Sequence, residues 1–158
     1  MPHLAQVNIG LPLEPLDSEL LREFVEALDP VNALADSSPG FVWRLQTEDG
    51  NATAICAFDD DRLIVNMSVW ESLEALRAFV YTSGHTDVMR RRREWFHKLD
   101  SYMALWWVPE GHVPTVAEAE ERLHMLETLG PTPAAFTFRR HFTPDAAGMD
   151  DDRWLCPA

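Results

Sequence analysis

The 158-residue sequence has few basic residues, few cysteines and no long apolar run. Its 13 lysines and arginines are outnumbered by 26 aspartates and glutamates, which gives a formal net charge of −13. This balance argues against a general nucleic-acid binder, because phosphate contacts dominate non-specific affinity and need many cations. No apolar run approaches the roughly 20 residues that cross a bilayer. We therefore expect neither a nucleic acid nor a membrane as a partner.

The two cysteines, Cys56 and Cys156, lie far apart and lack the spacing of metal ligands. A disulfide framework is not expected, and a reducing cytoplasmic compartment is the default. The first ten residues lack a basic stretch followed by an apolar one, so no signal peptide is predicted. The sequence also lacks a phosphate loop, a Rossmann fingerprint and a zinc-protease motif. We expect no metal and no cofactor.

The residues that are present predict one packed domain. Hydrophobic residues make up 46% of the chain, and its length suits a single core. We place the domain at residues 1–142. Residues 143–158 mix acidic residues with glycine and proline without periodicity, which predicts a flexible acidic tail.

Apolar periodicity predicts the element order β-α-β-β-α-β-α-β, with one further hairpin strand. Strands are expected over 3–10, 41–46, 52–58, 62–70, 102–108 and 134–142, and helices over 16–40, 71–84, 85–98 and 115–130. This order is typical of an α+β ferredoxin-like fold, with helices on one face of an antiparallel sheet. Apolar side chains on both strand faces predict that the open face pairs with a second copy in a dimeric α+β barrel, forms a pocket wall, or does both.

Three stretches together resemble the DUF3291 domain, a family of unknown function placed with the dimeric α+β barrels. They are VNMSVWESLEALRAFVY, HTDVMRRRREWF and LWWVPEGHVPTVAEAEERLHMLETLGPTPAAFTF. The resemblance implies a ferredoxin-like fold and a homodimer over residues 3–142. The wider superfamily includes cofactor-free monooxygenases, haem-binding and haem-degrading enzymes, lactone isomerases and small ligand-binding modules. No catalytic motif of those proteins can be transferred to this chain.

Four consecutive arginines, residues 90–93, interrupt an otherwise acidic sequence. At about 100° per residue, only Arg92 falls in the apolar helix stripe with His85, Met89 and Phe96. A buried guanidinium needs a partner. That partner is an internal carboxylate such as Glu71 or Glu110, or an anionic or phenolate ligand held by the planar donor fork. An error in the helical phase is the third alternative.

His85 also has more than one interpretation. It follows Gly84 and can simply begin the helix, bonded to the backbone. Its unperturbed pKa near 6.5 also suits a general base at neutral pH, which makes it our first candidate for proton transfer. Ligation of a haem iron is a minority alternative, because the sequence has no haem-attachment motif.

The stretch WWVPEGH, residues 106–112, is the second candidate cluster. Trp106 and Trp107 are predicted to face opposite sides of a strand, as core and dimer interface or as an aromatic wall. Glu110 and His112 follow at the strand end, where a pocket would open. The lesser candidates are Trp43, Asn66 and Ser68; the last two share a strand face with Trp70 and either line a cavity or face solvent.

The sequence thus predicts a cofactor-free enzyme: a monooxygenase, isomerase or cyclase acting on a small flat aromatic or polyketide-like molecule, as in secondary metabolism. The alternative is a non-catalytic module that binds a small molecule or haem. The expected catalytic residues are His85 and Arg92. The expected substrate-binding residues are Trp43, Asn66, Ser68, Met89, Phe96, Trp106, Trp107, Glu110 and His112.

Overall fold

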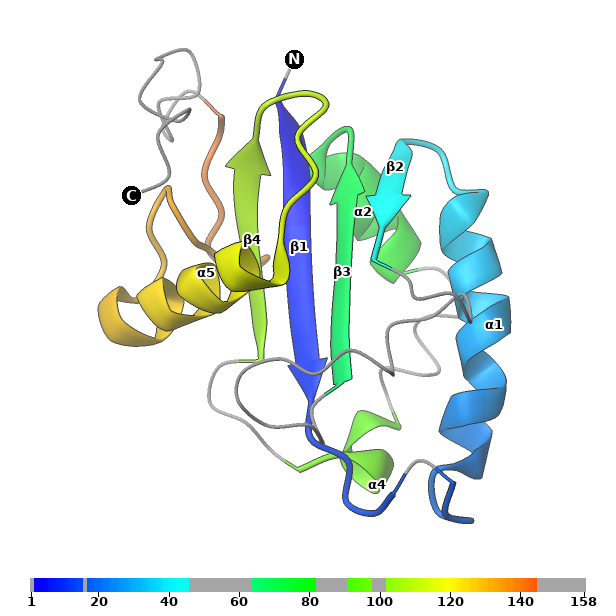
Figure 1. The fold of residues 1–158 in the computed structure, drawn as a ribbon. Coiled ribbons are helices and arrows are strands. Elements are labelled where there is room, and N and C mark those ends of the chain that lie inside the picture. The colour runs from blue at the N-terminus through cyan, green and yellow to red at the C-terminus, as the bar shows by residue number, and fades with distance from the viewer. Residues whose placement is uncertain (1, 16, 46–63, 82–90, 98–101, 145–158) are drawn as a thin grey trace.

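A four-stranded antiparallel sheet in the order β2-β3-β1-β4 lies at the centre of the protein (Figure 1). The computed structural model describes residues 2–15, 17–45, 64–81, 91–97 and 102–144. The strands are β1 His3–Gly10, β2 Phe41–Arg44, β3 Ile64–Trp70 and β4 Met103–Val108. The helices are α1 Arg22–Asp36, α2 Leu73–Val80, α4 Arg92–Trp95 and α5 Val116–Leu129. This is the ferredoxin-like strand order, and the predicted α+β class is confirmed.

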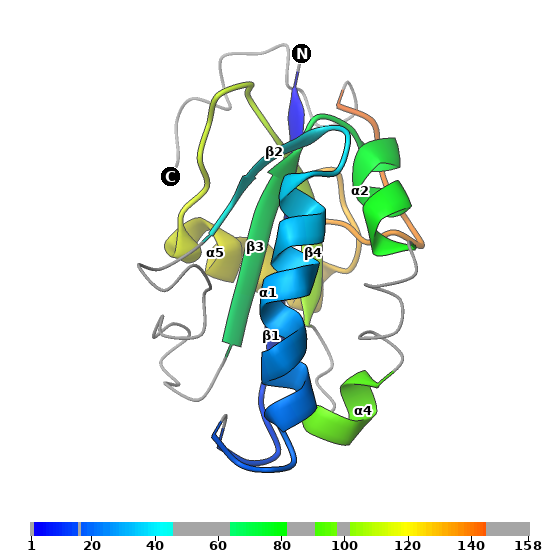
Figure 2. The ribbon, with the colours of Figure 1, turned by 90° about the vertical axis from the view of Figure 1, so that its right-hand side faces the viewer.

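The helices are divided between the two faces of the sheet. Helices α1 and α2 pack on one face, with Ala35 and Leu76 in one buried cluster with Trp70 and Leu105. Helix α5 packs on the opposite face, with Leu123 in a separate cluster. Figure 2 shows α5 and α2 on opposite sides of the sheet. The expectation of helices on one face therefore holds for α1 and α2, while α5 covers the other face.

The apolar face under α5 is already closed within a single chain. Val65 and Trp106 have no exposed surface, and Met67 is 1% exposed. Pairing of two sheets is therefore not needed to bury these side chains, and the homodimer stays a prediction.

Strand β2 corrects the predicted face of Trp43. Strict alternation along the strand expected over 41–46 predicts that Phe41 and Trp43 share one face. A bulge shifts the register between them, so that Phe41 pairs with Trp70 and Trp43 with the adjacent Val69. The extra residue reverses the faces. Phe41 packs on the α1 and α2 side, and Trp43 on the α5 side.

The strand predicted over 134–142 is absent from the described part of the chain. Of its described residues only Phe136 pairs with the sheet, exchanging two 2.8 Å backbone hydrogen bonds with Leu105 on the edge of β4. Turns on either side stop the pairing: Ala135 N–H donates to the Thr132 carbonyl, and Thr137 N–H donates to that of Arg140. The predicted hairpin strand over 52–58 lies outside the described residues.

Candidate active site between the sheet and the helices

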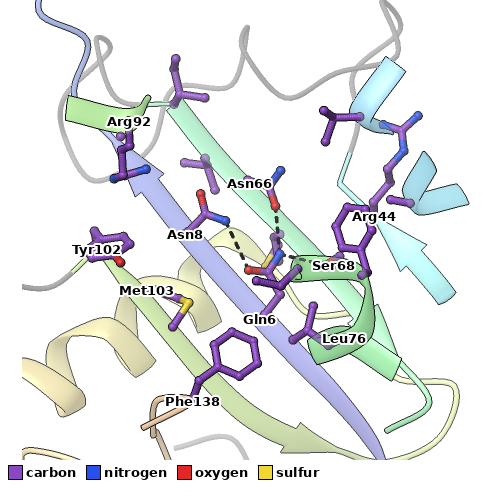
Figure 3. Close-up of a pocket in the computed structure, with 18 of the residues that line it drawn as sticks. Gln6, Asn8, Arg44, Asn66, Ser68, Leu76, Arg92, Tyr102, Met103 and Phe138 are labelled. Atoms are coloured by element: carbon purple, nitrogen blue, oxygen red, sulfur yellow. Dashed lines mark hydrogen bonds between the residues drawn. The ribbon is translucent and has the colours of Figure 1, made fainter. Parts of the chain in front are cut away.

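A cavity of about 1060 Å³ lies on the sheet face covered by α1 and α2 (Figure 3). Successive side chains of a strand point to opposite faces, so the cavity is lined chiefly by every second residue of β1 and β3, while Val65 and Met67 of β3 also border it. From β1 these are Gln6, Asn8 and Gly10, and from β3 they are Ile64, Asn66, Ser68 and Trp70. The residues between them are apolar and form the core under α5.

Four polar side chains form a row across the floor of the cavity. Gln6 lies directly opposite Ser68, and Asn8 directly opposite Asn66. The Gln6 Nε2 amide donates to Asn66 Oδ1 at 2.9 Å and to Ser68 Oγ at 2.8 Å. Asn8 Nδ2 in turn donates to Gln6 Oε1 at 3.4 Å. Gln6 is buried and holds the row together, while Asn66 is exposed toward the opening.

Trp70 fixes the Ser68 end of this row. Its indole N–H, which can only donate, reaches Ser68 Oγ at 2.8 Å. Ser68 Oγ thus accepts two hydrogen bonds, from Trp70 and from Gln6. No described residue accepts the Ser68 hydroxyl proton.

Arg92 lies at the far end of the same floor. Its Nη2 donates to the Ile9 carbonyl at 2.6 Å, and its guanidinium lies 4.4 Å from the centre of the Tyr102 ring. Burial lowers the pKa of Arg92, and the nearby Tyr102 hydroxyl opposes this shift. No carboxylate among the described residues pairs with Arg92. Of the predicted partners, neither Glu71 nor Glu110 fills this role.

A backbone bridge holds Arg92 in place. Leu13 N–H donates to the Trp95 carbonyl and His97 N–H to the Leu11 carbonyl, both at 2.8 Å. The Phe96 ring then lies directly on the β1 backbone, because a Cβ at Gly10 would come within 2.8 Å of that ring. The guanidinium of Arg92 lies 5.3 Å from the centre of the Phe96 ring. Gly10 thus permits the close approach that positions Arg92.

The arginine run is divided among different environments. Arg91 pairs with Glu23 and, at 2.9 Å, with Glu94, while Arg93 is exposed. Helix α4 ends at Trp95, so Phe96 is not a helical residue as predicted but an extended one. Its ring nevertheless lies beside Arg92, as expected. His85, Met89 and Arg90 lie outside the described residues.

The three predicted tryptophans do not line the cavity. Trp43 and Trp106 face the α5 side of the sheet. Trp107 faces the α1 and α2 side, where it is buried and its indole N–H donates to the Phe142 carbonyl at 2.8 Å. The predicted opposite orientation of Trp106 and Trp107 is correct, but both are core residues.

Glu110 and His112, predicted at the mouth of a pocket, also lie away from the cavity. His112 Nε2 instead lies 2.8 Å from Glu118 Oε1 at the start of α5. The other oxygen of Glu118 accepts the Trp106 indole N–H at 2.7 Å. Glu118 thus joins the loop that carries His112 to Trp106 in the core under α5, on the opposite face of the sheet from the cavity.

Sequence reasoning missed several residues that line the cavity: Gln6, Asn8, Arg77, Tyr102 and Met103. A signal for the first two was present, because Gln6 and Asn8 are two residues apart in a predicted strand and so share a face. No comparable pattern marked Arg77, Tyr102 or Met103.

Comparison with known proteins agrees with this architecture. The profile of a domain of unknown function, DUF3291, matches residues 3–152. The chain belongs to the DUF3291 family. None of the curated proteins matches its sequence.

Among solved structures, this DUF3291 protein is similar to SnoaB, a cofactor-independent oxygenase from Streptomyces nogalater. The identity is 19%, the match covers 73% of this chain and 100% of SnoaB, and the TM-score is 0.50. A candidate antibiotic biosynthesis monooxygenase from Chloroflexus aurantiacus also matches, at 19% identity, with 70% and 97% of the two chains covered and a TM-score of 0.46. The likeness to SnoaB shows a shared α+β fold.

Two features are absent from the described residues. These residues contain no group of three or more histidine, cysteine, aspartate or glutamate side chains arranged to hold a metal ion. None of their helices has the length and apolarity needed to span a membrane.

Proposed function

We propose that this DUF3291 protein is a cofactor-free enzyme that acts on a small flat aromatic or polyketide-like molecule. The observation that carries the proposal is Arg92, a half-buried guanidinium that lies in a large cavity and has no carboxylate partner among the described residues. Its planar fork suits an oxygen anion. Monooxygenation, isomerisation and cyclisation of such a molecule can all begin with the same step, removal of a proton to give an enolate or phenolate.

The floor of the cavity supplies the other groups that this step needs. Arg92 stabilises the oxygen on which negative charge develops, since preorganised donors are most effective where charge appears in the transition state. The Ser68 hydroxyl and the Asn66 amide hold a carbonyl or hydroxyl of the substrate. The apolar walls, among them Phe96 and Phe138, contact the flat faces of the rings.

His85 remains our proposed general base. It lies seven residues before Arg92 in the sequence, and its unperturbed pKa suits proton abstraction at neutral pH. Likeness in fold to a cofactor-independent oxygenase is consistent with chemistry that needs no bound group, but fold by itself does not assign function.

The test is turnover of a panel of polycyclic phenols and enolisable ketones, such as dithranol. Oxygen consumption and product mass are followed for the wild type, for His85→Ala and for Arg92→Ala. We expect both substitutions to abolish turnover in folded protein. Arg93→Ala is the matched control, because Arg93 is exposed on the same short helix. Normal turnover in both variants would contradict the assignment.

A non-catalytic binding module is the second candidate. One observation favours it: the described lining contains no histidine, aspartate or glutamate to act as a base. Saturable ligand binding without turnover of any panel member would support this alternative. Titration with hemin tests whether the bound small molecule is haem. A Soret band is expected if haem binds, and the absence of that band rejects haem binding.

We also propose that the protein is a homodimer, as in the barrel type that its fold resembles. Light scattering tests this directly. A mass near twice the 18.0 kDa of one chain is expected, and a monomer would contradict the proposal.

A further inference from the structure

The charge of the cavity is opposite to that of the protein. The chain carries 26 acidic residues, yet the lining includes no aspartate or glutamate among the described residues. Four of the nine arginines among the described residues line it instead: Arg44, Arg77, Arg92 and Arg139. The described part of the lining is therefore basic, although the chain as a whole is acidic.

Two of the four arginines are available to a ligand from a sheltered position. Arg44 is already paired, with its Nε 2.7 Å from Asp36 Oδ1, and Arg139 is exposed. Arg77 and Arg92 are both half-buried, and neither forms an ion pair with a described carboxylate. A guanidinium taken partly out of water without a counter-charge is costly, so an anionic ligand would relieve that cost at both positions.

These two arginines belong to opposite ends of the cavity. Arg92 bonds to Ile9, near the end of β1. Arg77 is on α2, which packs at the other end of the strands, where Phe79 stacks on Trp70 at 5.1 Å and Trp70 pairs with Leu4. Leu4 and Ile9 are five residues apart in an extended strand, or about 17 Å. In Figure 3, Arg92 and the α2 residue Leu76 lie on opposite sides of the row formed by Gln6, Asn8 and their partners.

We propose that the cavity binds an elongated planar organic anion with an acidic group at each end. Arg92 holds one acidic group and Arg77 the other, while the polar row from Asn66 to Ser68 contacts acceptor atoms between them. This inference names the class of ligand that the cavity binds. It rests on the proposed function only because both concern the same cavity. Binding is its readout, so it can be tested without turnover.

Three ligands of similar shape separate charge from shape: naphthalene-2,6-dicarboxylate, 2-naphthoate and the neutral 2-naphthamide. Isothermal titration of the full chain should give the tightest binding for the dicarboxylate and the weakest for the amide. A hydrogen bond to a charged group contributes enough that the dissociation constant should rise roughly 10- to 100-fold from the dicarboxylate to 2-naphthoate, and again from 2-naphthoate to 2-naphthamide. Equal affinity for 2-naphthoate and 2-naphthamide, or no saturable binding of either carboxylate, would overturn the proposal.

Substitutions assign the two ends. Arg92→Met should remove the preference for 2-naphthoate over 2-naphthamide, and Arg92→Lys should restore part of it because the charge remains. Arg77→Met should remove the advantage of the dicarboxylate over 2-naphthoate. Arg22→Met, on the exposed surface of α1, should change nothing. Wild-type binding of both carboxylates by the two folded methionine variants would overturn the assignment.

The proposed function and this inference fail in different ways. Anion preference that depends on Arg77 and Arg92, without turnover of any phenol or ketone, would leave the ligand class standing and reject the enzyme. Turnover of neutral phenols without any anion preference would support the enzyme and reject the proposed ligand class.

Discussion

The two faces of one sheet have opposite characters, although the same strands build both. On β1, Val7 is fully buried in the core under α5, while the adjacent Asn8 reaches the cavity. On β3, Val69 and Ser68 show the same division. The face under α5 is close-packed and apolar, and the face under α1 and α2 combines amides, hydroxyls and arginines with open space. Strand alternation therefore separates the residues of the core under α5 from those that line the cavity.

The largest effect is expected on the packed face. Trp106→Ala removes a fully buried indole and should lower the free energy of unfolding by about 3–5 kcal/mol. Urea unfolding followed by circular dichroism measures the loss. Val42→Ala is the control, because Val42 is 39% exposed and its loss should cost less than about 0.5 kcal/mol. Similar losses in the two variants would mean that Trp106 is not a core residue.

The next effect contrasts neighbours on β1. Val7→Asn places an amide in the apolar core and should cost about 2–4 kcal/mol, because the amide loses water without gaining partners. Asn8→Val changes the cavity face by one hydrogen bond and should cost about 1 kcal/mol or less. Thermal unfolding of both variants gives the comparison. Equal costs would show that the two faces do not differ in this way.

A smaller effect is expected where the loop joins the packed face. Glu118→Ala leaves the buried Trp106 indole N–H without its acceptor and should cost about 1–3 kcal/mol. Glu127→Ala, at an exposed position on the same helix, is the matched control. Calorimetry of the two variants measures the difference, and no difference would mean that water replaces the carboxylate.

The smallest effect on stability should come from the residue with the largest effect on function. Arg92→Met loses one hydrogen bond to Ile9 but also removes a partly buried charge, so the unfolding free energy should change by less than about 1 kcal/mol. Turnover or anion binding should nevertheless be lost. A decrease of several kcal/mol in the unfolding free energy of this variant would show that Arg92 stabilises the fold instead of serving the site.

Much of the fold could be read from local patterns. Apolar periodicity over 62–70 and 115–130 predicts β3 and α5, and the structure has both. The wrong predictions concern positions where hydrogen-bonded pairing with a neighbouring strand or turn overrides the local sequence pattern. The bulge in β2 turns Trp43 to the other face, and the turns around Phe136 reduce a predicted strand to one pair.

For the site, Arg92, Asn66, Ser68 and Phe96 were identified from the sequence, and the structure places all four in the cavity lining. The sequence also predicts a place in the site for four residues that lie elsewhere, because aromatic and titratable residues near a strand end resemble a pocket wall. These are Trp106, Trp107, Glu110 and His112. The structure gives their side chains other positions in the fold. Arg77 and Tyr102 were missed, because their place in the lining depends on how distant elements pack.

The amino-acid order determined which residues can share a face, since the periods of strand and helix are properties of the backbone. It therefore determined that Asn66 and Ser68 lie together and that Arg92 is separated from Arg91 and Arg93. Only the tertiary structure decided which face became the cavity and which the core under α5, because that depends on where α1, α2 and α5 pack. It also decided that Arg92 bonds to Ile9 and pairs with none of the described carboxylates, a contact across 83 residues of sequence.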